Sequence, residues 1–342
     1  MMESTANGAV AWREVGVIAQ QSDKWHHTMM RYLGFHQDAF FMFGISPGVC
    51  REALGRPDLL YTKPDVFDSR LFYSWSRFHH EKITKSKFST VHSYYGTCPF
   101  VWELGRVHMQ RYVEPKGSLF FLPRDDQVTI RVDEYKTVQD AIDSAPTPVT
   151  FLVPFRDCDK WKHWTKLKLP DDHQIVSLTD RESRQIKLSL LFQKHDHVYI
   201  PWPGTDLFYA SYLGKSIHLY DDITKYRTKT RDEMDRPPER VLMHLKWGYD
   251  YLTDKQKEFF HWCEDWNNID FHDRVWFTNN MLGLDALKSP KVLYDDLIKN
   301  GMIHPLQEYR HHESYHKGYE WCSKQRVDAE LTTQGARMAD IL

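Results

Sequence analysis

The sequence predicts an α/β protein built on a parallel β-sheet. Between residues 116 and 223, short apolar segments alternate with amphipathic helical segments at close intervals. Strands alternating with helices in this way are typical of βαβ units, which form parallel sheets. Apolar residues make up 41% of the chain and charged residues 27%. That balance supplies a sizeable core and excludes wholesale disorder.

Five buried strands are predicted in this region. They are Ser118–Leu122, Pro148–Val153, Gln174–Leu178, His197–Ile200 and Ser216–Tyr220. Three helices are predicted between them: Thr137–Ser144, Arg184–Lys194 and Asp206–Leu213. Thr137 and Asp140 resemble a capping box at the start of the first helix, and Gly214 is expected to end the third as its C′ residue. We therefore expect one doubly wound domain, with its ligand at the carboxyl ends of the strands.

The flanking regions give weaker patterns. Before residue 116 we expect strands at Ala39–Phe43 and Phe88–His92, a loop at Ser93–Pro99 and a helix at Phe100–Tyr112. After residue 223 we expect helices within Tyr249–Trp266 and Pro290–Asn300 that bridge the two halves, and a frayed tail over the last dozen residues. The predicted organisation is an N-terminal acceptor-side domain (1–115), a nucleotide-donor-binding domain (116–223) and a helical C-terminal region (224–342).

Composition excludes several classes of protein. Lys and Arg total 45 and Asp and Glu total 47, so the net charge of about −2 does not indicate a basic nucleic-acid binder. No stretch approaches the 18 apolar residues of a spanning helix, and the N-terminus lacks the pattern of a signal peptide. The five scattered cysteines favour a reducing compartment, so we expect a cytoplasmic protein.

The turn after the fourth strand is the most informative segment. A strand that ends in Gly204-Thr205 and opens a helix presents first-turn amides and the positive end of the helix dipole, which together bind phosphate. Gly204 permits close approach, and Thr205 adds a hydroxyl. Trp202, in the preceding Pro-Trp-Pro sequence, offers a flat ring for a base or sugar.

Two arginines follow the first and second strands. Arg124 and Arg156 would lie at strand carboxyl ends, where a guanidinium can hold a diphosphate in bidentate fashion without a metal. Surface ion pairs with Asp125 and Asp157 are the alternative for these arginines.

The segment PGTDLFYASYLGKSIHLYDD, ending at Asp222, resembles the nucleotide-sugar half of GT-B glycosyltransferases, especially those that build bacterial polysaccharides and teichoic-acid-like polymers. KGSLFFLPRDD and PVTFLVPFRD fall where that domain has its first two strands. The resemblance implies a GT-B-like α/β fold of two Rossmann-type parallel-sheet domains with bridging C-terminal helices. It also implies transfer of a sugar or related group from a nucleotide-activated donor to a hydroxyl acceptor in glycan biosynthesis.

The same resemblance implies the site residues. Donor-binding groups are expected at Arg124, Asp125, Arg156, Trp202, Gly204, Thr205, Asp206 and Tyr209. The segment His92–Phe100 resembles the loop of the family that contains Gly-Thr-Pro, which makes His92 the first candidate for the base. Glu103 and the pair His79-His80 are reserves. The nucleotide-sugar would be a co-substrate, with no bound cofactor and no metal. Its partner would be a glycan or other hydroxyl acceptor, not a nucleic acid, and peripheral membrane association stays open.

Three other interpretations stay open. Asp157-Cys-Asp159 is a D-x-D sequence after a strand, as in metal-dependent glycosyltransferases. His312-Glu313-Ser-Tyr-His316 matches the H-E-x-x-H pattern, in which two histidines one helical turn apart bind zinc and the glutamate acts as base, as in a zinc hydrolase. A non-catalytic protein that binds nucleotides or sugars would also use the Trp202 turn.

Overall fold

The structure of the chain is a computed structural model. It describes residues 28–29, 31–34, 44–45, 71–85, 92–110, 113–122, 129–153, 167–178, 184–228, 230, 232–233, 254–303 and 309–342. These residues belong to two compact units. Unit 1 draws on the ranges 1–112, 180–190 and 277–328, and unit 2 on the ranges 113–179, 191–276 and 329–342.

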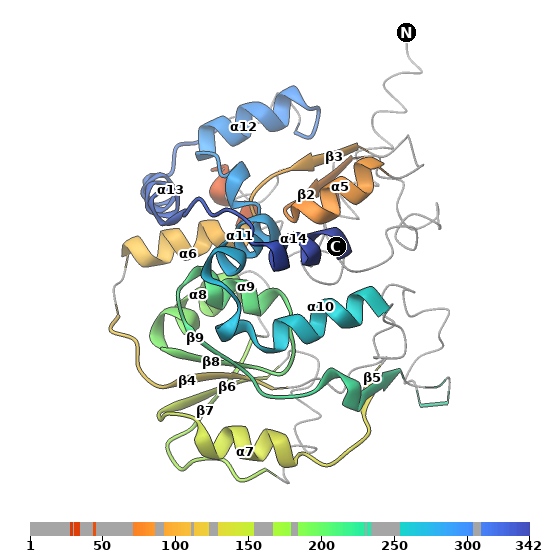
Figure 1. Ribbon diagram of the computed structural model, residues 1–342. Helices are drawn as coiled ribbons and strands as arrows, with labels where there is room; N and C mark the ends of the chain where they lie inside the picture. The colour runs from red at the N-terminus through yellow and green to blue at the C-terminus, as the bar shows by residue number, and fades with distance from the viewer. Residues whose placement is uncertain are drawn as a thin grey trace. The chain divides into compact units, whose positions relative to one another are not determined.

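Unit 2 is built on a five-stranded parallel sheet (Figure 1). Its strands are β4 (Ser118–Phe121), β6 (Val149–Val153), β7 (Gln174–Ser177), β8 (His197–Ile200) and β9 (Ser216–Leu219). They lie in the order β7-β6-β4-β8-β9, and every pairing is parallel. Each strand agrees with its predicted range to within one residue. The predicted α/β class with a parallel sheet is therefore confirmed.

Helices connect and flank these strands. Within unit 2 they are α7 (Lys136–Ser144), α9 (Thr205–Tyr212), α10 (Asp254–Glu264), α14 (Thr333–Ile341) and the 3-10 helices η3 (Ile223–Lys225) and η7 (Trp266–Asn268). Two further helices, α8 (Arg184–Lys194) and α11 (Phe271–Leu282), have residues in both units. The predicted helices over 184–194 and 206–213 are confirmed. Gly214 follows α9 with a φ of +62°, the left-handed conformation expected of a C′ glycine.

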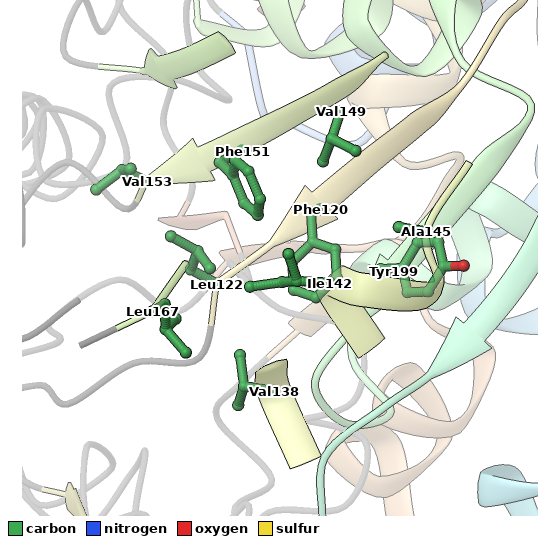
Figure 2. Close-up of a cluster of buried hydrophobic side chains, with 10 residues drawn as sticks. All are labelled: Phe120, Leu122, Val138, Ile142, Ala145, Val149, Phe151, Val153, Leu167 and Tyr199. Carbon is green, nitrogen blue, oxygen red and sulfur yellow. The ribbon is translucent and has the colours of Figure 1, made fainter. Parts of the chain in front are cut away.

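One face of the sheet packs against α7 (Figure 2). The register places Phe120 beside Phe151 and Tyr199, so these rings share that face. Val138 and Ile142, four residues apart on α7, belong to the same cluster, and these five side chains are all buried. Alternating apolar positions on the strands and helical spacing on α7 thus meet in one core.

The opposite face packs against α8 and α9. Phe121 points away from Phe120, and its ring centroid lies 5.7 Å from that of Phe192 on α8. Phe192 in turn meets Tyr209 of α9 edge-on at 6.2 Å. The chain leaving β4 therefore leads to α7 on one face, whereas the chain leaving β8 leads to α9 on the other. This reversal beside the central strand makes the β4–β8 carboxyl edge the topological switch point of the sheet.

The start of α7 differs from the prediction. The helix begins at Lys136, with Tyr135 as an N-cap that makes no side-chain capping bond. Thr137 lies inside the helix, and its hydroxyl accepts a hydrogen bond of 3.1 Å from Arg131. The expected capping box is wrong because the Thr137 hydroxyl has this partner outside the helix.

A second sheet in unit 2 has no counterpart in the prediction. β5 (Thr129–Arg131) and β10 (Tyr226–Thr228) form a two-stranded antiparallel ribbon in which Tyr226 pairs with Arg131. Strands of three residues are too short to give a recognisable alternation.

The C-terminal end of the chain is a helix, so the expectation of a frayed tail is wrong. Thr332 caps α14, and its hydroxyl accepts from the amide of Gly335 at 3.2 Å. Both the amide and the hydroxyl of Thr332 donate to the buried carboxylate of Asp273, the amide at 2.9 Å. Met338 and Leu342 are buried. The segment is an amphipathic helix whose buried face is hard to recognise among its polar residues.

Unit 1 contains a parallel sheet in the order β1-β2-β3. Its strands are β1 (Gly44–Ile45), β2 (Leu71–Ser74) and β3 (His92–Tyr95). Its helices are α5 (Arg77–Lys85), α6 (Pro99–Gln110), α12 (Pro290–Lys299), α13 (Glu313–Gln325) and the 3-10 helix η8 (Leu284–Ala286). The helices predicted near 100–112 and 290–300 are confirmed.

β3 runs further along the chain than expected. Residues 88–91 lie outside the described residues, as does the strand predicted at 39–43. The described strand begins at His92 and continues into the predicted loop, where Ser74 pairs with Tyr95. Aromatic residues such as Tyr94 and Tyr95 favour strands, and pairing with β2 extends β3 through them.

Candidate functional site

The turn Pro201–Gly204 carries the candidate site, because it joins β8 to α9 at the switch point of the unit 2 sheet. Ligands of open α/β sheets bind at the carboxyl ends of the strands where the chain order reverses. The neighbouring strand β4 lies across the switch point from β8. At its end, the carbonyl of Phe121 accepts a 2.5 Å hydrogen bond from the Tyr220 hydroxyl. That bond ties the end of β4 to the residue that follows β9.

Gly204 is the N-cap of α9, with φ −153° and ψ −171° and no side-chain capping bond. Any residue can adopt this extended conformation. A Cβ atom placed on Gly204 would have one heavy atom within 4 Å among the described residues, the carbonyl oxygen of Trp202 at 3.9 Å. Neither backbone conformation nor internal packing therefore calls for glycine here. Among the described residues, a side chain at this position would therefore meet little resistance.

Trp202, two residues before Gly204, is held in place. Pro201 and Pro203 flank it, are buried, and restrict the backbone on both sides. The half-buried indole meets the ring of Tyr226 edge-on, with centroids 4.7 Å apart and planes at 65°. A ring fixed in this way loses little conformational freedom when a base or sugar stacks on it.

Behind Trp202 lies a buried charged cluster that the sequence did not indicate. Arg131 of β5 forms an ion pair with Asp221, which follows β9, and the two side chains are 1% and 0% exposed. The Tyr226 hydroxyl donates to the same carboxylate at 2.7 Å. The Arg131 guanidinium also lies over the rings of Tyr135 and Tyr226. The Asp221-Asp222 pair was visible in the sequence, but its partner lies 90 residues away.

Electrostatics keeps this cluster in one protonation state. Burial by itself lowers the pKa of Arg131, but the hydrogen bonds and charge of Asp221 more than offset this, so the pKa is raised. Burial, followed by the charge of Asp221, raises the pKa of Tyr226 well above its usual value. Arg131 therefore stays charged and the Tyr226 hydroxyl stays a donor. The cluster is a fixed support for Trp202 and not a proton-transfer group.

The other predicted donor-binding residues separate into three groups. Thr205 and Asp206 form the first turn of α9, beside Gly204, and both are half-buried. Tyr209 is 2% exposed and packs against Phe192 in the core, which removes it from the site. The remaining positions, Arg124, Asp125 and Arg156, lie outside the described residues, as does the D-x-D sequence at 157–159.

On unit 1, the structure places His92 far from where a base is expected. His92 is the first residue of β3 and pairs with Leu71, the first residue of the parallel strand β2. It therefore lies at the amino end of this sheet, whereas parallel α/β sheets bind ligands at the carboxyl end. The loop that follows β3 is packed inward: the Thr97 hydroxyl donates to the Gly283 carbonyl at 2.9 Å, and Cys98 is buried.

His80, the reserve candidate on α5, has the geometry of an oriented base. Its Nδ1 lies 3.0 Å from the hydroxyl of Ser93, which donates to Ser74 at 3.0 Å. The oxygen of Ser93 is then free to accept from the Nδ1–H of His80, which leaves Nε2 without a proton. Burial lowers the pKa of His80 from 6.5, and its ring stacks on Tyr95 with centroids 5.4 Å apart.

Glu103, the other reserve, is a structural anion. Its carboxylate is fully buried on α6 and forms ion pairs with Arg106 at 2.9 Å and Arg31 at 3.4 Å. The hydroxyl of Tyr315 on α13 donates to the same carboxylate. Burial, and then the charge of Glu103, raise the pKa of Tyr315, so its proton stays in place. These bonds hold α6 to α13.

The H-E-x-x-H sequence does not form a helical pair. His312 precedes α13 as its N-cap, in an extended conformation, and its Nδ1 lies 2.8 Å from the Ser314 hydroxyl. Glu313 pairs with Lys317 at 2.6 Å. His316 meets the hydroxyl of Tyr309 at 2.6 Å. The three side chains thus face different partners.

The described residues contain neither a metal-binding cluster nor a membrane-spanning helix. No group of three or more His, Cys, Asp and Glu side chains in them is arranged to hold a metal ion. None of the helices that the structure describes has the length and apolar character needed to cross a bilayer.

Comparison with known proteins gave no match: no family model, no curated protein and no solved structure is similar to this chain.

Proposed function

We propose that the protein is a glycosyltransferase that moves a sugar, or a related group, from a nucleotide-activated donor to a hydroxyl acceptor. The observation that supports this most is Gly204, which lies at the start of a helix, at the switch point of a parallel sheet, with no packing contact among the described residues that excludes a side chain. Glycine is a favoured N-cap residue, and at such a position it also allows the close approach of a ligand phosphate.

In this proposal, the donor diphosphate lies over the first turn of α9. The helix dipole and backbone amides attract the phosphates, and the Thr205 hydroxyl adds a hydrogen bond. Asp206 carries a negative charge, so we assign it to a sugar hydroxyl and not to phosphate. Trp202 would stack on the base or sugar. Arg124 and Arg156, from the sequence, would neutralise the leaving diphosphate without a metal.

We assign the general base to His80, in place of His92. His80 is neutral near pH 7, and the Ser93–Ser74 relay fixes which ring nitrogen carries the proton. Nε2 is then the atom that takes the proton of the acceptor hydroxyl. The hydroxyl oxygen attacks the anomeric carbon, the bond to the diphosphate breaks, and the nucleoside diphosphate leaves with the electron pair.

The test is a thermal-shift screen with UDP, GDP, CDP, CMP, TDP and their sugar conjugates, followed by transfer assays with the donor that binds. We expect one nucleotide family to raise Tm by several degrees, because a ligand at about 100-fold its Kd adds about 2.7 kcal/mol. Gly204→Val should abolish this shift while the unliganded Tm changes little, since extended backbone accepts valine.

Ala336→Val, an exposed position on α14, is the matched control for adding a valine. It should keep the full nucleotide shift. Donor binding by Gly204→Val that equals that of the wild type would exclude this site. A nucleotide shift with no transfer or donor hydrolysis would instead favour a non-catalytic binding protein.

A further inference from the structure

Two histidines from neighbouring strands meet on the unit 2 sheet, away from the candidate donor site. His197 begins β8, and His218 lies on β9 opposite Tyr199. Because Tyr199 is two residues beyond His197, all three side chains point to the same face. The Nδ1 atom of His197 lies 3.1 Å from the Nε2 atom of His218, and both side chains are half-buried.

The surrounding side chains fix both rings. The imidazole of His218 stacks on Tyr199 with centroids 4.4 Å apart and planes at 12°. Tyr199 stacks in turn on Phe120 at 5.1 Å, in the buried core. The backbone of β9 is held as well, because the side-chain amide of Asn267 donates to the carbonyl of Ile217. The two nitrogens therefore stand in a preorganised arrangement.

The distance between the nitrogens matches the bite of a metal chelate. With a metal–nitrogen bond of about 2.1 Å, two imidazole nitrogens on one ion stand about 3.0 Å apart at a right angle and about 3.4 Å apart at the tetrahedral angle. In the structure the two nitrogens share a hydrogen bond, and its length of 3.1 Å also falls in this interval. A neutral imidazole offers one unprotonated ring nitrogen to a metal ion, and the tautomer decides which nitrogen it is.

We propose that His197 Nδ1 and His218 Nε2 chelate a late first-row divalent cation of the Zn²⁺ class, with water completing the coordination shell. Imidazole is a preferred ligand for these ions, and the partial exposure of both rings leaves room for solvent ligands. His197 pairs in register with the exposed Ser216, which leaves this end of the sheet accessible.

The ion would act on structure and not on transfer chemistry. His197 is at the amino end of β8, whereas the Gly204 turn follows its carboxyl end. A chelate would join β8 to β9, and β9 leads directly to Asp221. We therefore expect the ion to stabilise the edge strand that supports the Arg131–Asp221 cluster.

The test is calorimetric titration of EDTA-treated, dialysed protein with Zn²⁺ alone, on the full chain. The variants are His197→Gln, His218→Gln and the double variant, because glutamine keeps a hydrogen-bonding side chain of similar reach. We expect each single change to lower the affinity of one Zn²⁺ site by about 100-fold, since a chelate is lost with either ligand. The double variant should bind Zn²⁺ at this site more weakly than either single variant, because the remaining metal–nitrogen bond is lost as well.

His261→Gln and His312→Gln are the matched controls, because both residues are exposed and neither belongs to the pair. They should leave this site intact. A wild-type protein without such a site, or equal Zn²⁺ binding by His218→Gln, would overturn the proposal. Should the variants fail to fold by circular dichroism, electron paramagnetic resonance of wild-type protein with one equivalent of Cu²⁺ decides: coupling to two imidazole nitrogens supports the pair, and its absence refutes it.

Discussion

Arg131 and Asp221 form an ion pair that is almost fully buried, although 90 positions separate them in the sequence. One comes from the ribbon strand β5 and the other follows β9 of the main sheet. A buried charge must be paired, so this contact fixes the ribbon at the carboxyl edge of the sheet. The hydroxyl of Tyr226 forms hydrogen bonds with both partners, and its ring packs edge-on against Trp202. The ion pair therefore also helps to hold Trp202 in place.

Removing one member of this pair should be costly. We expect Asp221→Ala to lower the free energy of unfolding by about 3 kcal/mol, because the buried Arg131 guanidinium would keep only its ion pair with the partly exposed Asp133. Urea denaturation followed by tryptophan fluorescence measures the change. The double variant Arg131→Met/Asp221→Leu should recover most of the loss, since apolar residues of similar volume replace such pairs well.

The exposed pair Arg227–Glu233 provides the matched control in the same unit. Glu233→Ala should lower the free energy of unfolding much less than Asp221→Ala does, since water screens exposed charges. An equal loss in Asp221→Ala and Glu233→Ala would contradict the structural role given to the buried pair.

Replacing His80 and replacing His92 should have different effects on turnover. With the donor identified by the nucleotide screen, His80→Gln should lower turnover by about 10²-fold while donor affinity is kept. His92→Gln should leave turnover near wild type, because His92 lies at the amino end of the sheet. The measurement is kcat with a saturating donor. A large loss in His92→Gln and none in His80→Gln would reverse the assignment.

The pH profile tests the same residue independently. A base works only when neutral, and burial lowers the pKa of His80 from 6.5. Turnover should therefore exceed half of its maximum at pH 6.5 and fall as the pH drops through the lowered pKa. Ser93→Ala removes the acceptor that orients Nδ1–H and should lower kcat with little change in the KM for the donor. An acid limb centred above pH 6.5 would exclude His80 as the base.

Glu103 should matter for stability and not for turnover. Glu103→Gln removes the buried charge that Arg106 and Arg31 share, and we expect a loss of about 3 kcal/mol in unfolding free energy. Thermal unfolding measures that loss, and transfer assays below the lowered Tm measure activity. A folded Glu103→Gln protein with turnover reduced 10²-fold or more would restore Glu103 as a catalytic candidate.

Thr332 anchors the C-terminal helix to the rest of unit 2. Thr332→Ala removes the cap of α14 and a hydroxyl bound to the buried Asp273 carboxylate, so it should cost about 2 kcal/mol. The neighbouring Thr333→Ala, at an exposed position, should change stability by less than about 0.5 kcal/mol. Urea denaturation of both variants measures the two changes in the free energy of unfolding. Equal losses of stability in the two variants would mean that Thr332 does not anchor α14.

The amino-acid sequence by itself determined the main sheet of unit 2. Strands such as His197–Ile200 carry apolar residues in short runs bounded by prolines and glycines, and these local signals suffice to place them. The Gly204 turn was likewise visible, because strand, glycine and helix follow one another within a few residues.

Tertiary structure alone decided which residues face one another. The Arg131–Asp221 pair, the orientation of His80 by Ser93, and the contact between His197 and His218 all join residues from different elements. The same is true of Glu103, a reserve candidate for the base in the sequence, whose buried carboxylate forms ion pairs with two arginines. Local signals in a sequence report propensity and periodicity over a few residues. Charge pairing and burial depend on the packing of segments that are distant along the chain.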